Sequence, residues 1–187
     1  MLKHLATYWE AFKKTLNKRE PGFSTSIASL DRISGGIRRK ELVIIGARPG
    51  SGKTTLAANF ITEFLRQGLK VLMFPTEMGF NSLVDKLVAI ETGINLCKFR
   101  DNVLNDSDKE KIRLNEGKFF KYQLFVSEVS SPGYYDLRAA IEKVRPDILV
   151  VDFIQRCRFN DVDNIPMEMS KFTREIKNLA KEFNFAA

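Results

Sequence analysis

Apolar and polar positions alternate along this chain in a way that predicts strands and helices in turn. Short continuous apolar runs predict buried strands, and runs in which apolar residues recur every three or four positions predict helices. The expected strands cover residues 42–46, 70–75, 124–126 and 147–152, and the expected helices cover residues 2–17, 53–66, 81–92, 107–121, 134–144 and 167–183. Near-continuous apolar strands between helices indicate an α/β fold with a mostly parallel sheet covered by helices on both faces.

Polar residues at the helix ends sharpen some of these boundaries. We expect Asn81 to cap the helix over 81–92 at its N-terminus, and Gly93 to end that helix. Ser107 and Glu110 have the spacing of a capping box, which predicts a basic helix beginning at residue 107.

The first helix is amphipathic and separate from the rest of the pattern. Its apolar stripe consists of Leu2, Leu5, Trp9, Phe12 and Leu16. Pro21 and Gly22 then break the helix. We therefore divide the chain into a short linker helix at residues 1–20 and a main domain at residues 21–187. The helix has two alternative roles: it folds back on its own domain, or it is offered to a neighbouring subunit.

Composition and charge narrow the class of protein. The chain has 187 residues with 30 Lys and Arg against 23 Asp and Glu, a net charge of +7 that favours a polyanionic partner such as nucleic acid. No apolar run approaches the roughly 20 residues that span a bilayer, and the N-terminus lacks the pattern of a signal peptide. We expect a cytoplasmic protein with no membrane partner. Cys97 and Cys157 have no metal-ligand spacing and are expected to be buried or inert thiols.

A glycine-rich segment directly after the first apolar strand has the layout of a phosphate-binding P-loop. Its residues are Ala47, Arg48, Pro49, Gly50, Ser51, Gly52, Lys53, Thr54 and Thr55. Glycines allow backbone N–H groups to surround a phosphate, and the helix N-terminus adds a partial positive charge. Lys53 is expected to reach the β- and γ-phosphates, and the Thr54 hydroxyl to bind Mg²⁺. Ala47 stands where the strict pattern has glycine. The segment predicts a nucleotide-binding protein that uses ATP and Mg²⁺.

Two acidic residues follow the later strands. Asp152 ends an apolar strand in the manner of a Walker B motif and is expected to hold the metal opposite Thr54. Glu77 follows the strand over 70–75, so it is the candidate group that orients or activates water for hydrolysis. The alternative for Glu77 is a solvated loop residue.

Several motifs together resemble one family. The chain is similar to the ATPase domain of DnaB-type replicative helicases, a RecA-like group of bacteria and their phages. The resemblance covers residues 22–187 and is carried by the segments 22–36, 47–54, 77–78, 152–155 and 177–184. Alanine is common at the first P-loop position of that family, which accounts for Ala47.

The resemblance implies roles for single residues. Lys53 and Glu77 become the catalytic residues, Thr54 and Asp152 the metal-holding residues, and Gln155 joins residues 47–55 as a nucleotide-binding residue. It also implies a homo-hexamer in which the linker helix packs on the adjacent subunit. The implied function is an ATP-dependent motor that translocates on single-stranded DNA and unwinds duplex, with a primase or a helicase loader as further partners.

The end of the sequence leaves part of this function open. The chain stops where the family begins another strand, which inserts between the P-loop strand and the Walker B strand, so we expect a fragment of a longer protein. The sensor glutamine, the arginine finger and the main DNA-binding loops normally follow, and a chain without them is expected to lack turnover. The DNA-contacting residues cannot be assigned, and the segment 156–158 is expected to be a solvated loop. The alternatives are a RecA- or KaiC-like ATPase that controls assembly without unwinding, a small-molecule kinase, and a binding module without turnover.

Overall fold

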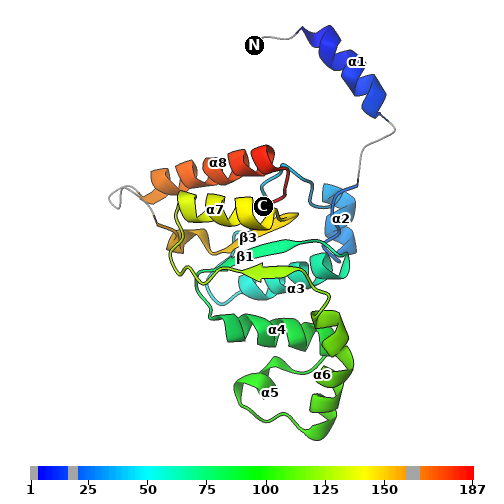
Figure 1. The fold of residues 1–187 in the computed structure, drawn as a ribbon, viewed down its shortest axis with the longest axis vertical. Helices are drawn as coiled ribbons and strands as arrows, with labels where there is room; N and C mark the ends of the chain where they lie inside the picture. Colours follow the sequence, from blue (N-terminus) through cyan, green and yellow to red (C-terminus); the bar gives the residue numbers. More distant parts are fainter. Residues whose placement is uncertain (1–3, 17–20, 159–164) are drawn as a thin grey trace.

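Three parallel strands form the centre of the fold (Figure 1). The computed structural model describes residues 4–16, 21–158 and 165–187. Strands β1 (Val71–Pro75), β2 (Leu124–Val126) and β3 (Ile148–Asp152) lie in the order β2-β1-β3. Pro75 at the end of β1 is in register with Asp152 at the end of β3. The loops that leave β1 and β3 therefore start at the same edge of the sheet.

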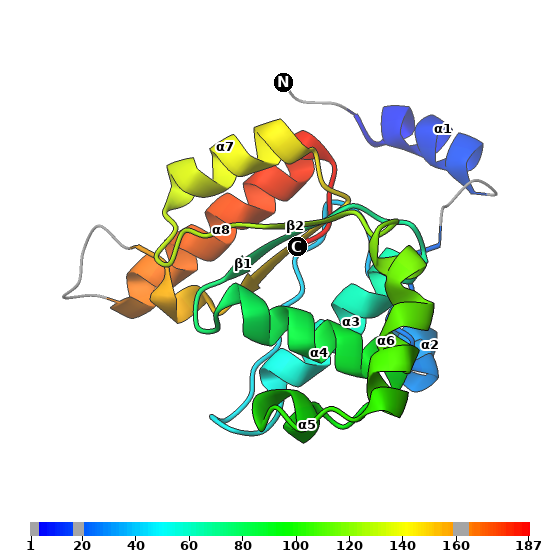
Figure 2. The same cartoon turned by 60° about the horizontal axis from the view of Figure 1, so that its bottom comes forward.

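Helices cover both faces of this sheet (Figure 2). The helices are α1 (Leu5–Thr15), α2 (Ala28–Ser34), α3 (Lys53–Arg66), α4 (Phe80–Thr92), α5 (Leu96–Arg100), α6 (Asp106–Phe119), α7 (Tyr134–Val144) and α8 (Ile165–Phe183), with a 3-10 turn η1 at Ile154–Arg156. Side chains of β1 alternate between two cores: Val71 and Met73 pack with α3 and α4, whereas Leu72 and Phe74 pack with α7 and α8. The predicted α/β fold with a parallel sheet between two helical layers is confirmed.

Two predicted helix caps are wrong. Helix α4 begins at Phe80 with Gly79 in the N-cap position, so Asn81 is inside the helix. Helix α6 begins with a capping box formed by Asn105 and Asp108, earlier in the chain than the box expected at Ser107 and Glu110. Asp108 is the better partner because its carboxylate also pairs with Lys98 at 2.7 Å, a contact between α5 and α6 that local spacing cannot reveal.

The predicted strand at residues 42–46 is also wrong. This segment has no strand structure, and the side chain of Ile44 is 71% exposed. A parallel strand is held by backbone hydrogen bonds to a neighbouring segment, and among the described residues only the start of this run makes such bonds. Ala187 accepts a hydrogen bond from Val43 N–H at 2.7 Å and donates one to the Glu41 carbonyl at 3.0 Å. Within the described part of the chain, residues 44–46 have no such backbone partner, which explains their irregular path.

Residues from the C-terminal end of the sequence lie between β3 and the start of the segment 42–46. Leu149 N–H donates to the Ala186 carbonyl at 2.8 Å, and Ala186 N–H donates to the Asp147 carbonyl at 2.9 Å. Ala186 thus lies beside β3 in parallel orientation, between β3 and the segment that leads to the P-loop. This is the insertion point that the family resemblance implies for the strand after α8.

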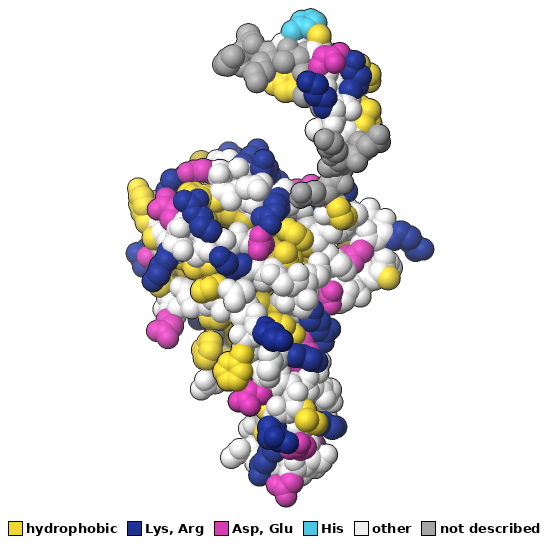
Figure 3. Space-filling model, turned by 45° about the vertical axis from the view of Figure 1, so that its right-hand side comes forward, with side chains coloured by type: hydrophobic (Ala, Val, Ile, Leu, Met, Phe, Trp, Pro, Cys, Tyr) yellow, Lys and Arg dark blue, Asp and Glu magenta, His cyan; other side chains and the backbone are white. Residues whose placement is uncertain are grey.

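Helix α1 lies apart from the layers (Figures 1 and 3). Leu5 is 74% exposed and Trp9 is 56% exposed, so the apolar stripe of this helix is uncovered. The helix runs over Leu5–Thr15, shorter than the predicted 2–17, and residues 2 and 17 lie outside the described residues. Across the described ranges, no helix is long and apolar enough to cross a membrane.

Candidate nucleotide-binding site

The P-loop forms an exposed turn that ends at the N-terminus of α3. Ser51 closes the turn, because its backbone N–H and its hydroxyl both donate to the Arg48 carbonyl, at 3.2 Å and 2.7 Å. Gly50 and Gly52 have φ angles of +74° and +93°, which side chains with a Cβ rarely adopt. Gly52 caps α3 without a side chain, so no side-chain acceptor uses the first N–H groups of the helix. Such N–H groups are the part of a helix that binds anions.

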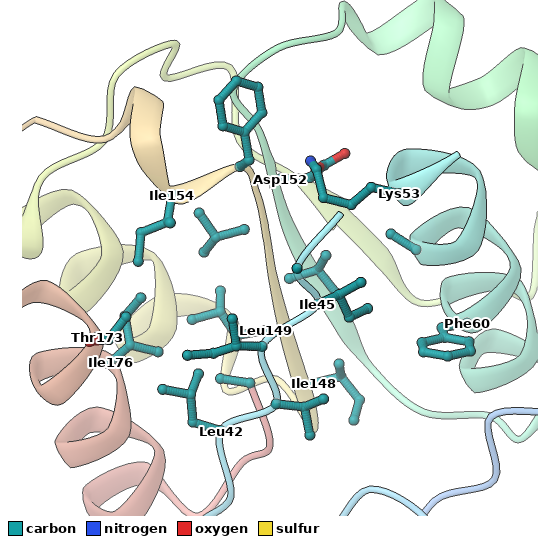
Figure 4. A pocket seen from close by; sticks show the side chains of 18 of the residues that line it. Leu42, Ile45, Lys53, Phe60, Ile148, Leu149, Asp152, Ile154, Thr173 and Ile176 are labelled. Carbon is teal, nitrogen blue, oxygen red and sulfur yellow. The ribbon is translucent and has the colours of Figure 1, made fainter. Parts of the chain in front are cut away.

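Lys53, the first residue of α3, and Asp152, the last residue of β3, meet at one end of the cavity drawn in Figure 4. The Lys53 ammonium forms an ion pair with Asp152 Oδ1, although 99 residues separate the two in sequence. Asp152 is buried, and its Oδ2 atom has no hydrogen-bond partner among the described residues. The Lys53 ammonium also lies 4.6 Å from the centre of the Phe153 ring. The sequence predicted both charged residues but not their contact.

The donor groups here fit a magnesium ion that is shared with phosphates. The orphaned Oδ2 atom of Asp152 is a free carboxylate oxygen, and the hydroxyl-bearing Thr54 lies in the first turn of α3. In the described ranges, no three His, Cys, Asp or Glu side chains gather as a metal site. Mg²⁺ is commonly held by one or two carboxylates with substrate phosphates and water, so a complete protein cage is not required.

Glu77 lies at the same edge of the sheet as Asp152. It is exposed and stands two residues after Pro75, the register partner of Asp152. Thr76, between Pro75 and Glu77, donates its backbone N–H to the Asp152 carbonyl at 2.8 Å. The exits of β1 and β3 are therefore hydrogen-bonded to each other beside the P-loop.

The turn after β3 carries the remaining candidates. Gln155 is exposed within η1. Arg156 and Arg158 are exposed, as expected for a solvated loop, although Cys157 between them is buried. Arg158 N–H donates to the Pro132 carbonyl at 3.0 Å, which ties this turn to the segment before α7. Cys157 is buried and Cys97 is exposed. The expected burial is therefore found for Cys157 and not for Cys97.

An apolar cavity of about 410 Å³ extends from the Lys53–Asp152 pair along β3. Figure 4 shows Leu42, Ile45, Leu149 and Ile176 lining it, with the charged pair at one end. The cavity continues the line of residues 185–187 between β3 and the P-loop segment. It is an apolar neighbour of the charged site.

Sequence reasoning missed two residues of this site, Thr76 and Phe153. Thr76 is a buried polar residue whose hydroxyl is hydrogen-bonded to the backbone of Phe153. Its position between an apolar strand and the candidate glutamate was the available signal. Phe153 belongs to the segment 152–155 that carries the family resemblance, but no role was predicted for it.

Comparison with known proteins gives one consistent result. The family described as "DnaB-like helicase C terminal domain" matches residues 22–187. The replicative DNA helicase DnaB of Treponema pallidum is 31% identical over 138 residues, which cover 71% of this chain and 32% of that protein. The replicative DNA helicase DnaC of Bacillus subtilis is 27% identical over 168 residues, which cover 86% of this chain and 37% of that protein. The chain thus spans about a third of the length of these relatives.

Solved structures share the fold. One of them, described as an ATPase domain, superposes with a TM-score of 0.82 at 19% identity, covering 97% of this chain and 66% of that one. A DnaB-like replicative helicase, described with its interactions with primase, gives the same TM-score and identity with 45% of its chain covered. At this identity the likeness concerns the RecA-like fold alone.

Proposed function

The chain belongs to the DnaB-like helicase C-terminal domain family, and from this premise we propose that it is the ATP-hydrolysing motor domain of a replicative DNA helicase. In this proposal ATP hydrolysis drives translocation on single-stranded DNA and unwinding of duplex. The observation that carries it is the Lys53–Asp152 ion pair, formed between the start of the P-loop helix and the end of β3. DnaB-like ATPase domains use nucleotide, and our finer proposal is ATP with Mg²⁺.

The residues have separate tasks in this proposal. The turn at residues 47–52 and the first N–H groups of α3 bind phosphate, with Thr55 and Gln155 beside them. Lys53 exchanges its partner Asp152 for the β- and γ-phosphates. Asp152 and the Thr54 hydroxyl would hold Mg²⁺, which would neutralise developing phosphate charge. Glu77, exposed at the same edge, orients and deprotonates the attacking water.

Single-stranded DNA is the proposed polyanionic partner. The net charge of +7 favours it, and Lys and Arg side chains are spread over the face in Figure 3 among Asp and Glu. Contacts between these cations and DNA phosphates make binding sensitive to salt. A cytoplasmic location, and a primase or a helicase loader as a further partner, belong to the same proposal.

Helix α1 is the proposed contact between subunits of a homo-hexamer, and residues 1–20 the linker that carries it. Its support is the uncovered stripe that includes Leu5 and Trp9. Burying an aromatic anchor of this kind contributes about 1.5–3 kcal/mol. Trp9→Ala is therefore expected to shift the protein toward monomers in sedimentation velocity, whereas Lys14→Ala, an exposed charge on the same helix, is not. Equal sedimentation of both variants and the wild type would argue against this role of α1.

ATP hydrolysis with and without single-stranded DNA tests the function. The measurement uses the full-length protein, with Glu77→Gln as the control. Stimulation by DNA, together with a control that binds ATP without hydrolysing it, supports the motor. Turnover that ignores DNA contradicts it. The alternative, a RecA- or KaiC-like ATPase that controls assembly, predicts DNA-independent or pairing activity, so separation of a forked duplex distinguishes the two.

A further inference from the structure

Thr76 joins the two strand exits of the site through three hydrogen bonds. Thr76 follows β1 and precedes Glu77, and the residue is 6% exposed. Its backbone N–H donates to the Asp152 carbonyl at 2.8 Å, and its hydroxyl donates to the Phe153 carbonyl at 2.9 Å. The same hydroxyl accepts the Phe153 N–H at 2.8 Å. One side chain thus bonds to both backbone polar groups of Phe153, whose carbonyl also accepts the Arg156 N–H at 3.1 Å.

We propose that Thr76 is a positioning residue for nucleotide hydrolysis, which sets the placement of Glu77 relative to Asp152; this rests on the proposed function. The ladder between β1 and β3 ends at the pair of Pro75 and Asp152. Beyond that pair, the backbone of Phe153 is bonded to the Thr76 hydroxyl, where a continued ladder would use backbone groups of β1. A hydroxyl can do this because it both donates and accepts.

The hydrogen bonds of Thr76 to Asp152 and Phe153 form a joint between the two strand exits. The chemistry of the site depends on this joint because the candidate hydrolytic and metal-holding groups are its immediate neighbours. Glu77 follows Thr76, and Asp152 precedes Phe153. The Phe153 ring also lies 4.6 Å from the Lys53 ammonium. A change at the joint therefore moves the water-activating group, the metal-holding group and the phosphate-binding lysine relative to one another. Misplacement of reacting groups by about 1 Å can lower a rate roughly 100-fold.

Three variants separate positioning from ordinary packing. Thr76→Val keeps the shape and removes the hydroxyl, and Thr76→Ser keeps the hydroxyl. Thr62→Val is the matched control, because Thr62 is a buried threonine of α3 whose hydroxyl donates within its own helix to the Ala58 carbonyl at 2.8 Å. It loses a buried hydroxyl without touching the strand exits.

We expect Thr76→Val to lower kcat for DNA-stimulated ATP hydrolysis by about 10- to 100-fold, with KM for ATP changed by less than about 3-fold. Thr76→Ser should recover kcat to within about 3-fold of wild type, and Thr62→Val should retain it. Equal kcat for Thr76→Val and wild type overturns the proposal. So does an equal loss in Thr76→Val and Thr76→Ser, since the hydroxyl would then not be the cause.

The joint itself is tested by hydrogen exchange at the Phe153 amide, which needs no turnover. Thr76→Val should accelerate that exchange and Thr76→Ser should not; unchanged exchange in Thr76→Val overturns the inference. If Thr76→Val does not fold, Thr76→Cys, with a weak thiol donor, should give intermediate exchange and intermediate kcat, and wild-type values for both overturn the inference. If wild-type protein hydrolyses no ATP, the proposed function fails, and the exchange measurement still decides whether the Thr76 hydroxyl holds the backbone of Phe153.

Discussion

Glu91 is the centre of a buried cluster that fixes the P-loop helix to the helices beside it. Its side chain is 2% exposed. It accepts hydrogen bonds from Arg66 Nε of α3 at 2.8 Å and from the Tyr122 hydroxyl, which precedes β2. The Lys118 ammonium of α6 lies 3.6 Å away. A single carboxylate therefore connects α3, α4 and α6 behind the nucleotide site.

Glu91→Gln tests how much this cluster contributes to stability. The change keeps the shape and removes the charge, so it loses charge-assisted hydrogen bonds worth about 1.5–3 kcal/mol each. Arg66 is nearly half exposed and can hydrate when its partner is lost, which reduces the cost. We expect a loss of about 2 kcal/mol in the free energy of unfolding. For a chain of this size, that corresponds to a decrease in Tm of about 4–8 °C.

Glu110→Gln is the matched control for this measurement. Glu110 forms an ion pair with Arg113 on the surface of α6 at 2.7 Å, with both side chains at least half exposed. Exposed pairs of this kind contribute about 0.5 kcal/mol or less, so its Tm should change by no more than about 2 °C. Thermal unfolding followed by circular dichroism compares the two variants. Equal Tm shifts would refute the assignment of stability to the buried cluster.

The effect of Glu91→Gln should also depend on pH. Burial raises the pKa of the Glu91 carboxyl, but the hydrogen bonds from Arg66 and Tyr122 and the nearby positive charges outweigh it, so the net pKa lies below the ordinary value of 4.5. A lowered pKa means that the stabilisation is present above the unfolded-state pKa and is lost as pH falls through the folded-state pKa. The Tm difference between wild type and variant should be full at neutral pH and shrink below about pH 4.5. A difference that stays constant into that range would contradict the ion-pair explanation.

Three further predictions concern the site and the cysteines. Lys53→Ala should weaken binding of a fluorescent ATP analogue by about 10- to 100-fold, whereas Lys70→Ala, at the opposite edge of the sheet, should not. Asp152→Asn removes the competing partner of Lys53, so Mg²⁺-free nucleotide should bind at least as tightly as to wild type, while the gain from adding Mg²⁺ is lost in titration calorimetry. Burial raises the pKa of the Cys157 thiol to about 12, so a thiol reagent should modify Cys97 in the folded protein and Cys157 only on unfolding.

The sequence predicted best those elements whose limits are set locally. The helices over Lys53–Arg66 and Tyr134–Val144 and the strand Leu124–Val126 have the predicted bounds. In each, the apolar period and the flanking turn residues agree. The short helices α2 and α5 were missed, since five to seven residues show too little periodicity to stand out from a loop.

Prediction failed where a distant partner decides the outcome. The segment 105–110 contains two overlapping sequence patterns for a capping box, one at Asn105 and Asp108 and one at Ser107 and Glu110. The ion pair of Lys98 with Asp108 favours the first. The apolar run 42–46 has the composition of a buried strand, yet a strand exists only beside another strand. Hydrogen bonds reach it from Ala187 at one end alone, so the rest of the run stays irregular.

The same distinction explains what the sequence predicted of the site. Motif spacing identified Lys53 and Asp152 as separate residues because each lies at the end of its own element. It could not predict that they pair with each other, because the contact arises when α3 and β3 meet across 99 positions. The pairing has a chemical consequence. A buried carboxylate with one orphaned oxygen needs a cation nearby, and Lys53 supplies that positive charge in this structure. Under the proposed function, a phosphate that binds Lys53 would leave Asp152 without its counterion, and bound Mg²⁺ would balance the charge of Asp152.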